Sequence, residues 1–280
     1  MSRQKYRVVT AIPAYNEEKL LGGLLDQVLD QEYDDVYVLD DASTDATVEV
    51  ASFYGKDVNV IEGKENVGSG ANRNRIIPKL GGSAIIHFID ADIRLNTDRG
   101  PERVREVITH SDIGFVGGLV RNPDGSQHPW NYGPVFSLPQ MLSSWAYTGI
   151  NRLAKTDPVA ARALRSSLNR WMLMEQWPDP QKEPRARKVY WACEANLVIP
   201  SDVFVTVGGY DPNFRYHEVM ELAMRLEQLG LNRRFDPLID VTHQNLEWLN
   251  KGYTHEFWSA LVRIVGKTGI KEFMAPSKKY

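Results

Sequence analysis

Two aspartates one residue apart, Asp90 and Asp92, have the clearest chemical potential in this chain of 280 residues. They follow the apolar run Ala84–Ile89, which has the composition of a buried strand in a parallel sheet. Ligands bind at the carboxyl ends of the strands in open α/β sheets. Neighbouring carboxylates repel each other unless a cation lies between them, and their oxygens suit Mg²⁺ or Mn²⁺. The pair therefore predicts a metal ion that binds a phosphorylated substrate. The structural alternative is that the two aspartates only form a polar turn after the strand.

The composition bounds the class of protein. The chain is 42% hydrophobic and 25% charged, which is enough for a substantial core. A net charge of -3 argues against a general nucleic-acid binder. The single cysteine, Cys193, cannot form an internal disulfide, which favours a reducing compartment. We find no signal-peptide pattern and no apolar run of about 20 residues, so we expect a cytoplasmic protein with at most peripheral membrane contact.

The first half of the chain alternates between strand-like and helix-like runs, a pattern of βαβ units with a mostly parallel sheet. The strand-like runs are Arg7–Ile12, Val36–Leu39, Val58–Ile61, Ala84–Ile89 and Ile113–Leu119. The helix-like runs are Glu17–Gln31, Thr47–Tyr54, Ala71–Leu80 and Pro101–His110. Loops at the carboxyl ends of the first, second and fourth strands should meet at one crevice.

The second half loses this alternation. Residues 134–188 are helix-like and rich in Trp and Met, and they end in a basic loop with Lys182, Arg185, Arg187 and Lys188. We expect Val189–Ile199 to be mainly strand, and Tyr216–Leu229 and Tyr253–Gly266 to be helices. No flexible Gly/Ser linker occurs, so the change near residue 125 marks a change of role within one domain, 1–280.

Four polar segments follow predicted strands or begin predicted helices. Taken singly, each has a structural explanation as a helix cap or a turn. The segments are Ile12-Pro13-Ala14-Tyr15-Asn16-Glu17-Glu18, Leu39-Asp40-Asp41-Ala42-Ser43-Thr44-Asp45, Glu65-Asn66-Val67-Gly68-Ser69-Gly70-Ala71-Asn72-Arg73-Asn74 and Asp90-Ala91-Asp92.

In this order the four segments resemble the inverting family-two glycosyltransferases of the A-type nucleotide-sugar fold. Glu194-Ala195-Asn196-Leu197, Gly208-Gly209-Tyr210-Asp211 and the helix start Glu218–Leu226 extend the resemblance. It covers about residues 7–92 and 189–230. It implies a single α/β domain with a nucleotide-binding sheet flanked by helices, in which 1–125 binds a nucleotide-sugar and the helical half 126–280 shapes the acceptor site. The reaction implied is metal-dependent transfer of a sugar to a hydroxyl group of a glycan, a lipid-linked intermediate or a small metabolite.

The donor-binding roles agree with this resemblance, and a UDP-sugar is the favoured donor. Tyr15 can stack on a base above Pro13, Glu17 can accept from ribose hydroxyls, and Asp41 can accept from an imide N–H. The amides from Gly68 to Ala71 add positive potential at a helix start. Arg73 can either reach a phosphate or neutralise Asp90. The nucleotide-binding set is thus Pro13, Tyr15, Glu17, Asp41, Gly68, Arg73, Asp90 and Ala91.

The metal, Mn²⁺ or Mg²⁺, is expected on Asp92. Asp90 should serve the sugar or ribose, or bind the metal through water. Enzymes of this fold often take a third ligand, commonly histidine, from a region that corresponds to His243. His217 is the rival, and a histidine with a purely structural role is the alternative for both. The metal would stabilise the leaving diphosphate.

The catalytic base is the point at which the resemblance is weakest. Inverting transfer needs a carboxylate that takes the acceptor proton. The family usually presents Glu-Asp at the start of this helix, whereas this chain has Glu218 and then Val219. Glu218 is therefore the first candidate, and Glu194 is the second. Glu221 should instead pair with Arg225, four residues on.

Other interpretations stay open. The tryptophans Trp130, Trp145, Trp171 and Trp177 could cover the acceptor cleft, pack in the core, or help an amphipathic helix, Leu164–Trp177, to lie on a membrane. A nucleotidyltransferase shares the architecture, but it usually has a Gly-rich loop with Arg or Lys after the first strand. A catalytically silent nucleotide-sugar-binding module would explain the apolar Val219.

Overall fold

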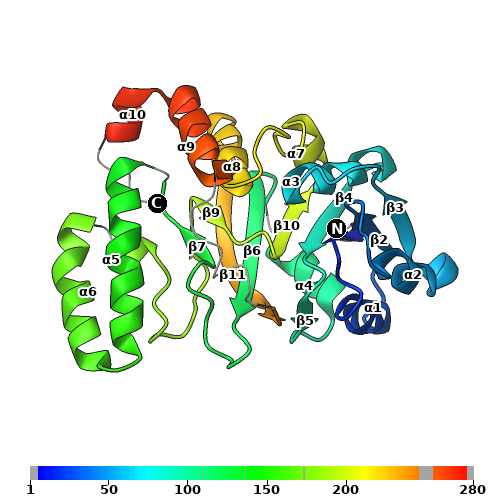
Figure 1. Cartoon of the computed structure of the whole chain (residues 1–280), viewed down its shortest axis with the longest axis horizontal. Helices are drawn as coiled ribbons and strands as arrows, with labels where there is room; N and C mark the ends of the chain where they lie inside the picture. Colours follow the sequence, from blue (N-terminus) through cyan, green and yellow to red (C-terminus); the bar gives the residue numbers. More distant parts are fainter. Residues whose placement is uncertain (1–5, 109, 136, 173, 246–254, 276–280) are drawn as a thin grey trace.

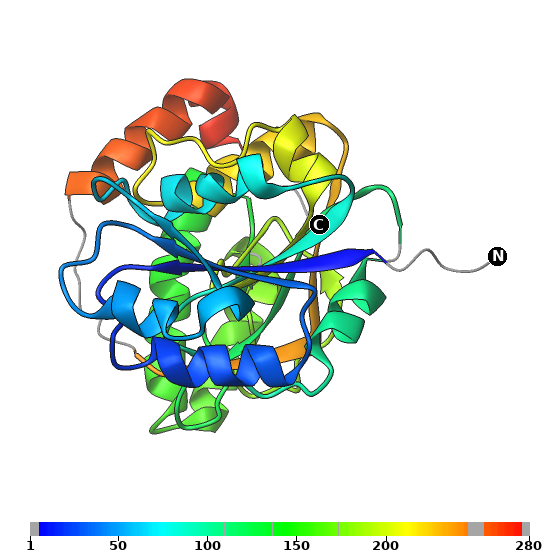
Figure 2. The same ribbon diagram turned by 90° about the vertical axis from the view of Figure 1, so that its right-hand side faces the viewer.

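A central β-sheet with helices on both faces forms the body of the molecule (Figures 1 and 2). The computed structural model describes residues 6–108, 110–135, 137–172, 174–245 and 255–275. Successive side chains on a strand point to opposite faces, so a sheet that is apolar on both faces needs cover on each. Val9 and Ala11 accordingly belong to one buried cluster, and Val8 and Ile12 to the other.

The large sheet has the order β3-β2-β1-β4-β10-β6-β11-β5, and β8 pairs with β11. The strands β3, β2, β1 and β4 run parallel, whereas β10 is antiparallel to both β4 and β6. A small second sheet joins β7 to β9. The strands are β1 Arg7–Ala14, β2 Asp35–Asp40, β3 Asn59–Glu62, β4 Ala84–Ile89, β5 Ile93–Leu95, β6 Ile113–Arg121, β7 Tyr132–Gly133, β8 Arg187–Lys188, β9 Trp191–Ala192, β10 Asn196–Pro200 and β11 Asn232–His243.

The helices α1, α2 and α4 cover one face of the sheet, and α3, α7 and α8 cover the other (Figure 2). The pair α5 and α6 stands beside the sheet (Figure 1). The α-helices are α1 Leu21–Asp30, α2 Thr47–Ser52, α3 Ser69–Arg73, α4 Gly100–Val107, α5 Leu138–Ala154, α6 Pro158–Met172, α7 Ser201–Thr206, α8 Glu218–Gln228, α9 His255–Thr268 and α10 Ile270–Met274, and the 3-10 turns are η1 Gly55–Asp57, η2 Asn74–Lys79 and η3 Met174–Gln176. No helix in the described ranges combines the length and the apolar character that crossing a membrane requires.

The five strands predicted in the first half are confirmed, with small shifts at their ends. The helix expected over Glu17–Gln31 begins only at Leu21. The amides of Asn16, Glu17 and Glu18 donate instead to side chains that follow β2. The helix expected over Ala71–Leu80 divides into α3 and η2, and η2 contains Pro78, which has no N–H to donate.

Two predictions for the second half were wrong in detail. The strand expected over Val189–Ile199 is interrupted, because the chain turns at Glu194–Ala195 between β9 and β10. The segment that ends at His243, for which the sequence predicted no strand, is the end of the long strand β11. The helix expected over Tyr253–Gly266 corresponds to α9, with its first two residues outside the described ranges.

Core packing explains two of the four tryptophans considered in the sequence analysis, Trp130 and Trp177. Trp177 is buried; its ring stacks on Tyr147 and meets Trp130 edge to face, with centroids 5.1 and 5.3 Å away. Trp130 packs against the same cluster. Trp145 is exposed, and the side chain of Trp171 lies outside the described residues. The core interpretation therefore holds for Trp130 and Trp177.

A buried amide joins the two halves of the sheet. The side chain of Asn196 on β10 donates from Nδ2 to the carbonyl oxygens of Leu119 on β6 and Ile239 on β11, at 3.2 and 3.1 Å. Its Oδ1 lies 2.9 Å from Nε2 of His87 on β4. An amide oxygen can only accept, so Nε2 of His87 carries the proton, and Nδ1 accepts from the Tyr33 hydroxyl at 3.0 Å. Four buried hydrogen bonds thus depend on the Asn196 amide and the His87 imidazole.

We expect Asn196→Ala to lower the free energy of unfolding by about 2–4 kcal/mol, because each buried group left without a partner costs roughly 1–3 kcal/mol. Urea titration at equilibrium measures this change. Asn59→Ala is the control, since the Asn59 amide makes one hydrogen bond from an exposed side chain to the Val36 carbonyl oxygen. Equal stability losses in the two variants would contradict the role given to Asn196.

Candidate active site

The acidic pair lies where β4 ends, as expected for a ligand site in this class of sheet. Asp90, Asp92 and His243 each offer a ligand atom, and these atoms all lie within 4.8 Å of one another. The strand pairing explains the grouping: β11 runs antiparallel to β5, which follows the acidic pair, and His243 comes opposite Ile93. His243 Nδ1 then lies 3.5 Å from Asp92 Oδ2. We refer to these three residues as the ligand cluster.

Electrostatics marks the ligand cluster as a place for a cation. Burial, and secondly the charge of Asp90, raise the pKa of Asp92 to about 7. Burial, Asp92 and Asp90 likewise raise the pKa of Glu17 to about 7. A carboxylate that is this hard to ionise gains from a neighbouring positive charge. Two carboxylates and an imidazole form a donor set that fits a divalent ion such as Mn²⁺.

The loops after β1 and β2 hold each other in place. The Asn16 amide donates to Ser43 Oγ at 3.0 Å, and the Glu17 amide donates to Thr47 Oγ1 at 2.8 Å. Asn16 adopts the left-handed conformation, with φ of 57°. Pro13 is buried within β1, while the ring of Tyr15 is 47% exposed. An exposed ring on a fixed loop is available for stacking.

Asp41 organises the loop that precedes α3. Its Oδ1 accepts from the Val67 amide at 3.1 Å, and its Oδ2 accepts from the Gly68 amide at 2.9 Å. Arg75 Nη2 lies 3.3 Å from the same Oδ1. Gly68 has a φ of 93°, which strongly favours glycine at this turn. Recognition of a base by Asp41 stays a prediction; the structure shows that both oxygens already hold this loop.

Arg73 pairs with Asp90, which is the second of the two arrangements considered for it. Arg73 Nη2 lies 2.6 Å from Asp90 Oδ1, and only 1% of the Arg73 side chain is exposed. The guanidinium carbon lies 5.9 Å from the ring centroids of both Phe88 and Tyr210. Ser69 accepts a further hydrogen bond from Nη1. Arg73 is therefore held on several sides.

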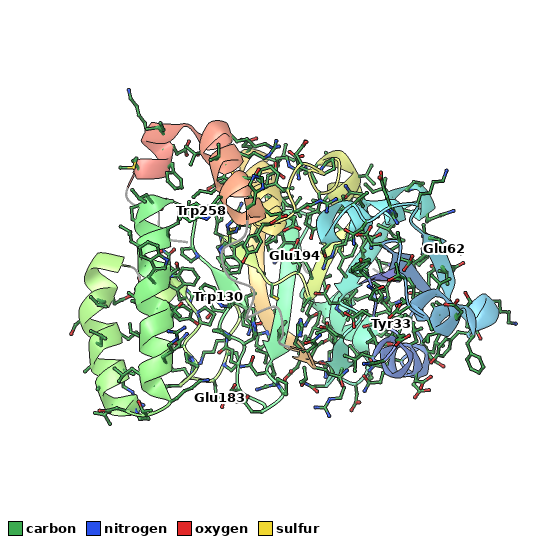
Figure 3. The ribbon with its side chains drawn as sticks, in the orientation of Figure 1. Tyr33, Glu62, Trp130, Glu183, Glu194 and Trp258 are labelled. Atoms are coloured by element: carbon green, nitrogen blue, oxygen red, sulfur yellow. The ribbon has the colours of Figure 1, made fainter. Side chains whose placement is uncertain are left out.

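The two candidate bases, Glu194 and Glu218, both lie close enough to Arg73 for its positive charge to lower their pKa values. Burial raises the pKa of Glu194 to about 8, although Arg73 opposes the shift. Glu194 sits at the turn between β9 and β10, near the centre of the molecule (Figure 3). Burial also raises the pKa of Glu218, but the charge of Arg73 and a hydrogen bond from the Gly70 amide oppose this rise. The structure thus brings Asp90, Glu194 and Glu218 around one guanidinium.

The structure also shows where three further residues from the sequence analysis lie: His217, Val219 and Glu221. His217 is not part of the ligand cluster found among the described residues, and burial lowers its pKa to about 3. Val219, at the position of the family's usual aspartate, packs in the core and is 7% exposed. Glu221 pairs with Arg225 at 2.6 Å, which confirms its structural role, and Lys267 of α9 contacts the same carboxylate.

Sequence reasoning missed two supporting residues. A Cβ on Gly70 would lie 2.9 Å from Glu218 Cγ, so glycine lets α3 approach the start of α8. The Asn74 side chain brackets the backbone of Tyr210: its Nδ2 donates to the Tyr210 carbonyl and its Oδ1 accepts from the Tyr210 amide, both at 2.8 Å. The presence of Gly70 and Asn74 in one segment was the available signal, but their partners are about 140 residues away.

This geometry can hold a divalent cation, with carboxylates around Arg73 that could accept a proton. Known proteins that resemble this chain in sequence or fold are glycosyltransferases. A curated relative, N-acetylglucosaminyl-diphospho-decaprenol L-rhamnosyltransferase of Mycobacterium tuberculosis, is 24% identical over 246 residues, which are 84% of this chain and 74% of the relative.

Solved glycosyltransferases share the fold. The crystal structure of GalNAc-T7 with UDP, GalNAc and Mn²⁺ matches with a TM-score of 0.65 at 14% identity, over 95% of this chain but only 48% of the GalNAc-T7 chain. The mannosyltransferase PcManGT from Pyrobaculum calidifontis, in complex with GDP-Man and Mn²⁺, matches with a TM-score of 0.59 at 16% identity, over 92% of this chain and 64% of that one.

The family itself follows from the sequence match. The model for glycosyl transferase family 2 matches residues 10–165, which is more than half of the chain and includes the loops after β1 and β2, Arg73 and the acidic pair. The chain is therefore a glycosyltransferase that belongs to glycosyl transferase family 2, an inverting family.

Proposed function

We propose that this glycosyltransferase moves a sugar from a UDP-sugar to a hydroxyl group of its acceptor, in a reaction that depends on Mn²⁺ or Mg²⁺. The observation that carries the proposal is the ligand cluster of Asp90, Asp92 and His243, next to the buried ion pair of Arg73 and Asp90. Residues 1–125 bind the donor and residues 126–280 shape the acceptor site. The acceptor is a glycan, a lipid-linked intermediate or a small metabolite.

The donor lies along the loops that follow β1, β2 and β3. Tyr15 stacks on the base, Glu17 accepts from the ribose, and Asp41 recognises the base edge from beneath the loop. The full donor set is Pro13, Tyr15, Glu17, Asp41, Gly68, Arg73, Asp90 and Ala91. UDP accompanies Mn²⁺ in GalNAc-T7, which supports a uridine donor, while GDP-Man in PcManGT makes guanosine the competing base.

Asp92 and His243 would hold the metal directly, with Asp90 as a ligand or as a partner of the sugar. When bound, a divalent ion supplies positive charge that stabilises a leaving diphosphate. Arg73 keeps a second positive charge at the same place, because its guanidinium is fixed by Asp90 and two aromatic rings.

Glu218 is the proposed base. A base must be ionised before it can accept a proton, and burial raises the pKa of both Glu194 and Glu218, so the groups around each carboxylate decide between them. Glu218 begins α8, where the helix dipole favours a negative charge, and it accepts from the Gly70 amide. Removal of the acceptor proton by Glu218 leaves the hydroxyl oxygen free to attack the anomeric carbon as the bond to the diphosphate breaks.

The first prediction about function concerns the metal. In Asp92→Asn, we expect the affinity for UDP in the presence of Mn²⁺ to fall about tenfold or more, since a lost interaction with a charged group costs roughly 1.5–3 kcal/mol. EDTA should weaken binding to the unchanged protein similarly. Isothermal calorimetry measures both effects, with the exposed Asp98→Asn as the control for charge. UDP affinity that is the same with and without metal would overturn the proposal.

The second prediction concerns pH. The pKa of about 7 means that Asp92 holds a proton in much of the metal-free protein below pH 7, and Mn²⁺ must displace it. We therefore expect Mn²⁺ affinity to fall as the pH drops from 8 to 6, by up to about tenfold per unit for one proton. Calorimetry in buffers of different ionisation enthalpy counts the released proton. The control Glu17→Gln should keep the pH dependence of Mn²⁺ affinity. An Mn²⁺ affinity that does not change with pH in the unchanged protein would contradict the prediction.

The third prediction separates the two carboxylates. Glu218→Gln keeps the size of the side chain but cannot accept a proton, so turnover should fall by about 10²–10⁴ while UDP affinity is retained. Glu194→Gln is the paired variant, and donor hydrolysis with Mn²⁺ is the assay. Loss of turnover in Glu194→Gln alone would move the base to the turn before β10. Normal rates in both would show that neither carboxylate is the base, whereas absence of donor hydrolysis by the unchanged protein would favour the silent nucleotide-sugar-binding module suggested by Val219.

A further inference from the structure

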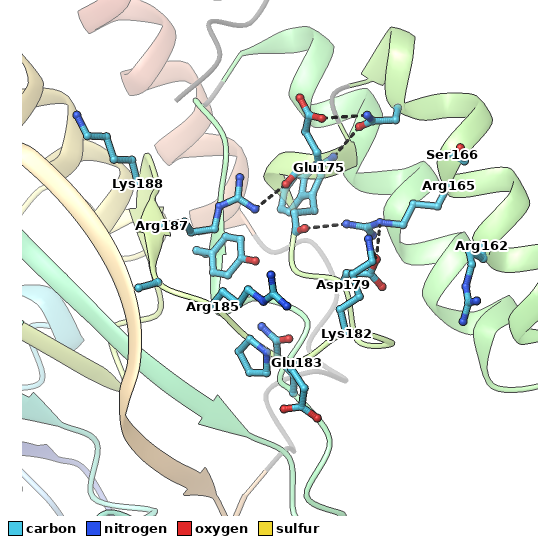
Figure 4. Close-up of a pocket in the computed structure, with 16 residues that line it drawn as sticks. Arg162, Arg165, Ser166, Glu175, Asp179, Lys182, Glu183, Arg185, Arg187 and Lys188 are labelled. Atoms are coloured by element: carbon cyan, nitrogen blue, oxygen red, sulfur yellow. Dashed lines mark hydrogen bonds and ion pairs between the residues drawn. The ribbon is translucent and has the colours of Figure 1, made fainter.

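A large cavity is lined by residues between Gln127 and Lys188, which lie between the two stretches that carry the motifs of the family resemblance. Its volume is about 1010 Å³, and it opens between α6, the segment after α6 and the loop that leads into β8 (Figure 4). Tyr132 of β7 and Trp177 contribute to its wall. The ligand cluster takes no part in this wall. The cavity is therefore distinct from the proposed donor site.

The wall of the cavity is strongly basic. Six cationic side chains contribute to it, against three acidic ones, Glu175, Asp179 and Glu183. The cationic residues are Arg162, Arg165, Lys182, Arg185, Arg187 and Lys188. Such a concentration contrasts with the net charge of -3 for the whole chain.

The acidic residues do not neutralise this wall. Asp179 contacts Arg165 at 3.5 Å and Lys182 at 3.4 Å, so one carboxylate serves two cations. Within the described ranges, Arg185, Arg187 and Lys188 take part in no ion pair. Positive charge therefore remains available to an anionic ligand.

Two of the guanidinium groups are fixed in advance. Arg165 donates from Nη2 to the carbonyl oxygens of Met174 and Trp177, at 2.6 and 2.7 Å, and Arg187 donates from Nη1 to the Glu175 carbonyl at 2.7 Å. Arg187 also lies over the Tyr132 ring, 5.3 Å from its centroid. Figure 4 shows Arg165 and Arg187 on opposite sides of the cavity.

These two groups keep unused donors. Arg165 Nη1 and Arg187 Nε are buried and have no hydrogen-bond partner in the part of the chain that the structure describes. A buried donor without a partner is costly unless a ligand satisfies it. Guanidinium groups match phosphate oxygens in geometry as well as in charge.

The cavity adjoins the proposed active site through its wall. Gln127 belongs to the wall, and the next residue, His128, is close enough to His243 of the ligand cluster to feel its charge. On the other side, the Trp177 ring packs against Trp191, whose centroid is 6.1 Å away and which precedes Glu194 by three residues. The wall of the cavity is thus continuous, through the chain and through ring packing, with residues that lie next to a metal ligand and to Glu194.

We propose that this cavity binds the phosphate or diphosphate group of the acceptor, and hence that the sugar is transferred to a phosphorylated compound. The inference rests on the proposed function, since it specifies the acceptor of the same reaction. It is independent of the donor-binding residues, because the donor's own phosphates lie at the ligand cluster. The volume allows a diphosphate and part of the group that carries it.

The test uses inorganic pyrophosphate as the probe, in EDTA, so that no metal can hold it at the ligand cluster. Calorimetry should detect binding to the unchanged protein and a loss of about tenfold or more in Arg185→Gln/Lys188→Gln, since charged hydrogen bonds are lost. Lys56→Gln/Lys79→Gln removes the same charge from exposed positions in the other half of the chain and should stay within about twofold. UDP affinity with Mn²⁺ should be the same in all three proteins.

The outcomes separate the two proposals. If UDP and Mn²⁺ bind but pyrophosphate does not, or if both double variants weaken it equally, the cavity has no such role and the proposed function stands. If UDP and Mn²⁺ fail to bind, the proposed function fails whatever pyrophosphate does. Inorganic sulfate that competes as well as pyrophosphate would also overturn the inference, because the cavity would then attract any anion.

Competition against pyrophosphate identifies the source of the phosphate. A short-chain N-acetylglucosaminyl diphosphate lipid that displaces it would indicate a lipid-linked acceptor, the chemistry named for the mycobacterial relative. N-acetylglucosamine 1-phosphate that displaces it better would indicate a free sugar phosphate. Displacement by neither compound would exclude a phosphorylated N-acetylglucosamine as the source of the phosphate, and the pyrophosphate and sulfate results would then decide the inference.

Discussion

The buried charge of Arg73 is the constraint on which the rest of the site depends. Burial alone would lower the pKa of a guanidinium, but Asp90, Glu194 and the other acidic groups around it outweigh burial and raise the pKa of Arg73. A charge that is 99% removed from solvent by its fold needs such partners, because an unpaired one would cost several kcal/mol. Glu194 and Glu218, in turn, would be harder to ionise without Arg73, because its charge lowers the pKa of both. The acidic residues and the arginine therefore stabilise one another.

The mixed sheet is what delivers these groups to one place. The parallel strands β1, β2 and β4 end at one edge, which aligns the loops after β1 and β2 with the acidic pair. The antiparallel strand β10 enters beside β4 from the opposite direction, so that the turn before it carries Glu194 to the same edge. The pairing of β11 with β5 then adds His243. The amide of Asn196 binds β4, β10, β6 and β11 together in this order, which makes the position of the site a property of the sheet.

The sequence predicted the parts of the site that depend on local structure. Asp90 and Asp92 follow a recognisable strand, and the segments after β1 and β2 carry their polar residues in consecutive positions. The position of Glu194 was harder to predict, because strands of two different sheets flank it. β9 pairs with β7 in the small sheet, β10 pairs with β4 in the large sheet, and the chain must turn between them. Asp41 shows another limit: a carboxylate after a strand predicts a ligand, but its oxygens hold the Val67 and Gly68 amides, whose position no local pattern gives. The basic cavity was visible only as a charged loop, since its other wall comes from α6.

The two halves of the chain have opposite electrostatic characters, and this difference bears on how the reaction is organised. The donor side gathers carboxylates that need a cation, whereas the cavity on the other side gathers cations that need an anion. Two phosphorylated substrates repel each other in water, so an enzyme that joins them must neutralise each one separately. A metal at the ligand cluster and arginines in the cavity would do this with different chemistry, which prevents either substrate from occupying the place of the other. The net charge of -3 for the whole chain therefore conceals two regions of opposite local charge, each of which would suit a different ligand.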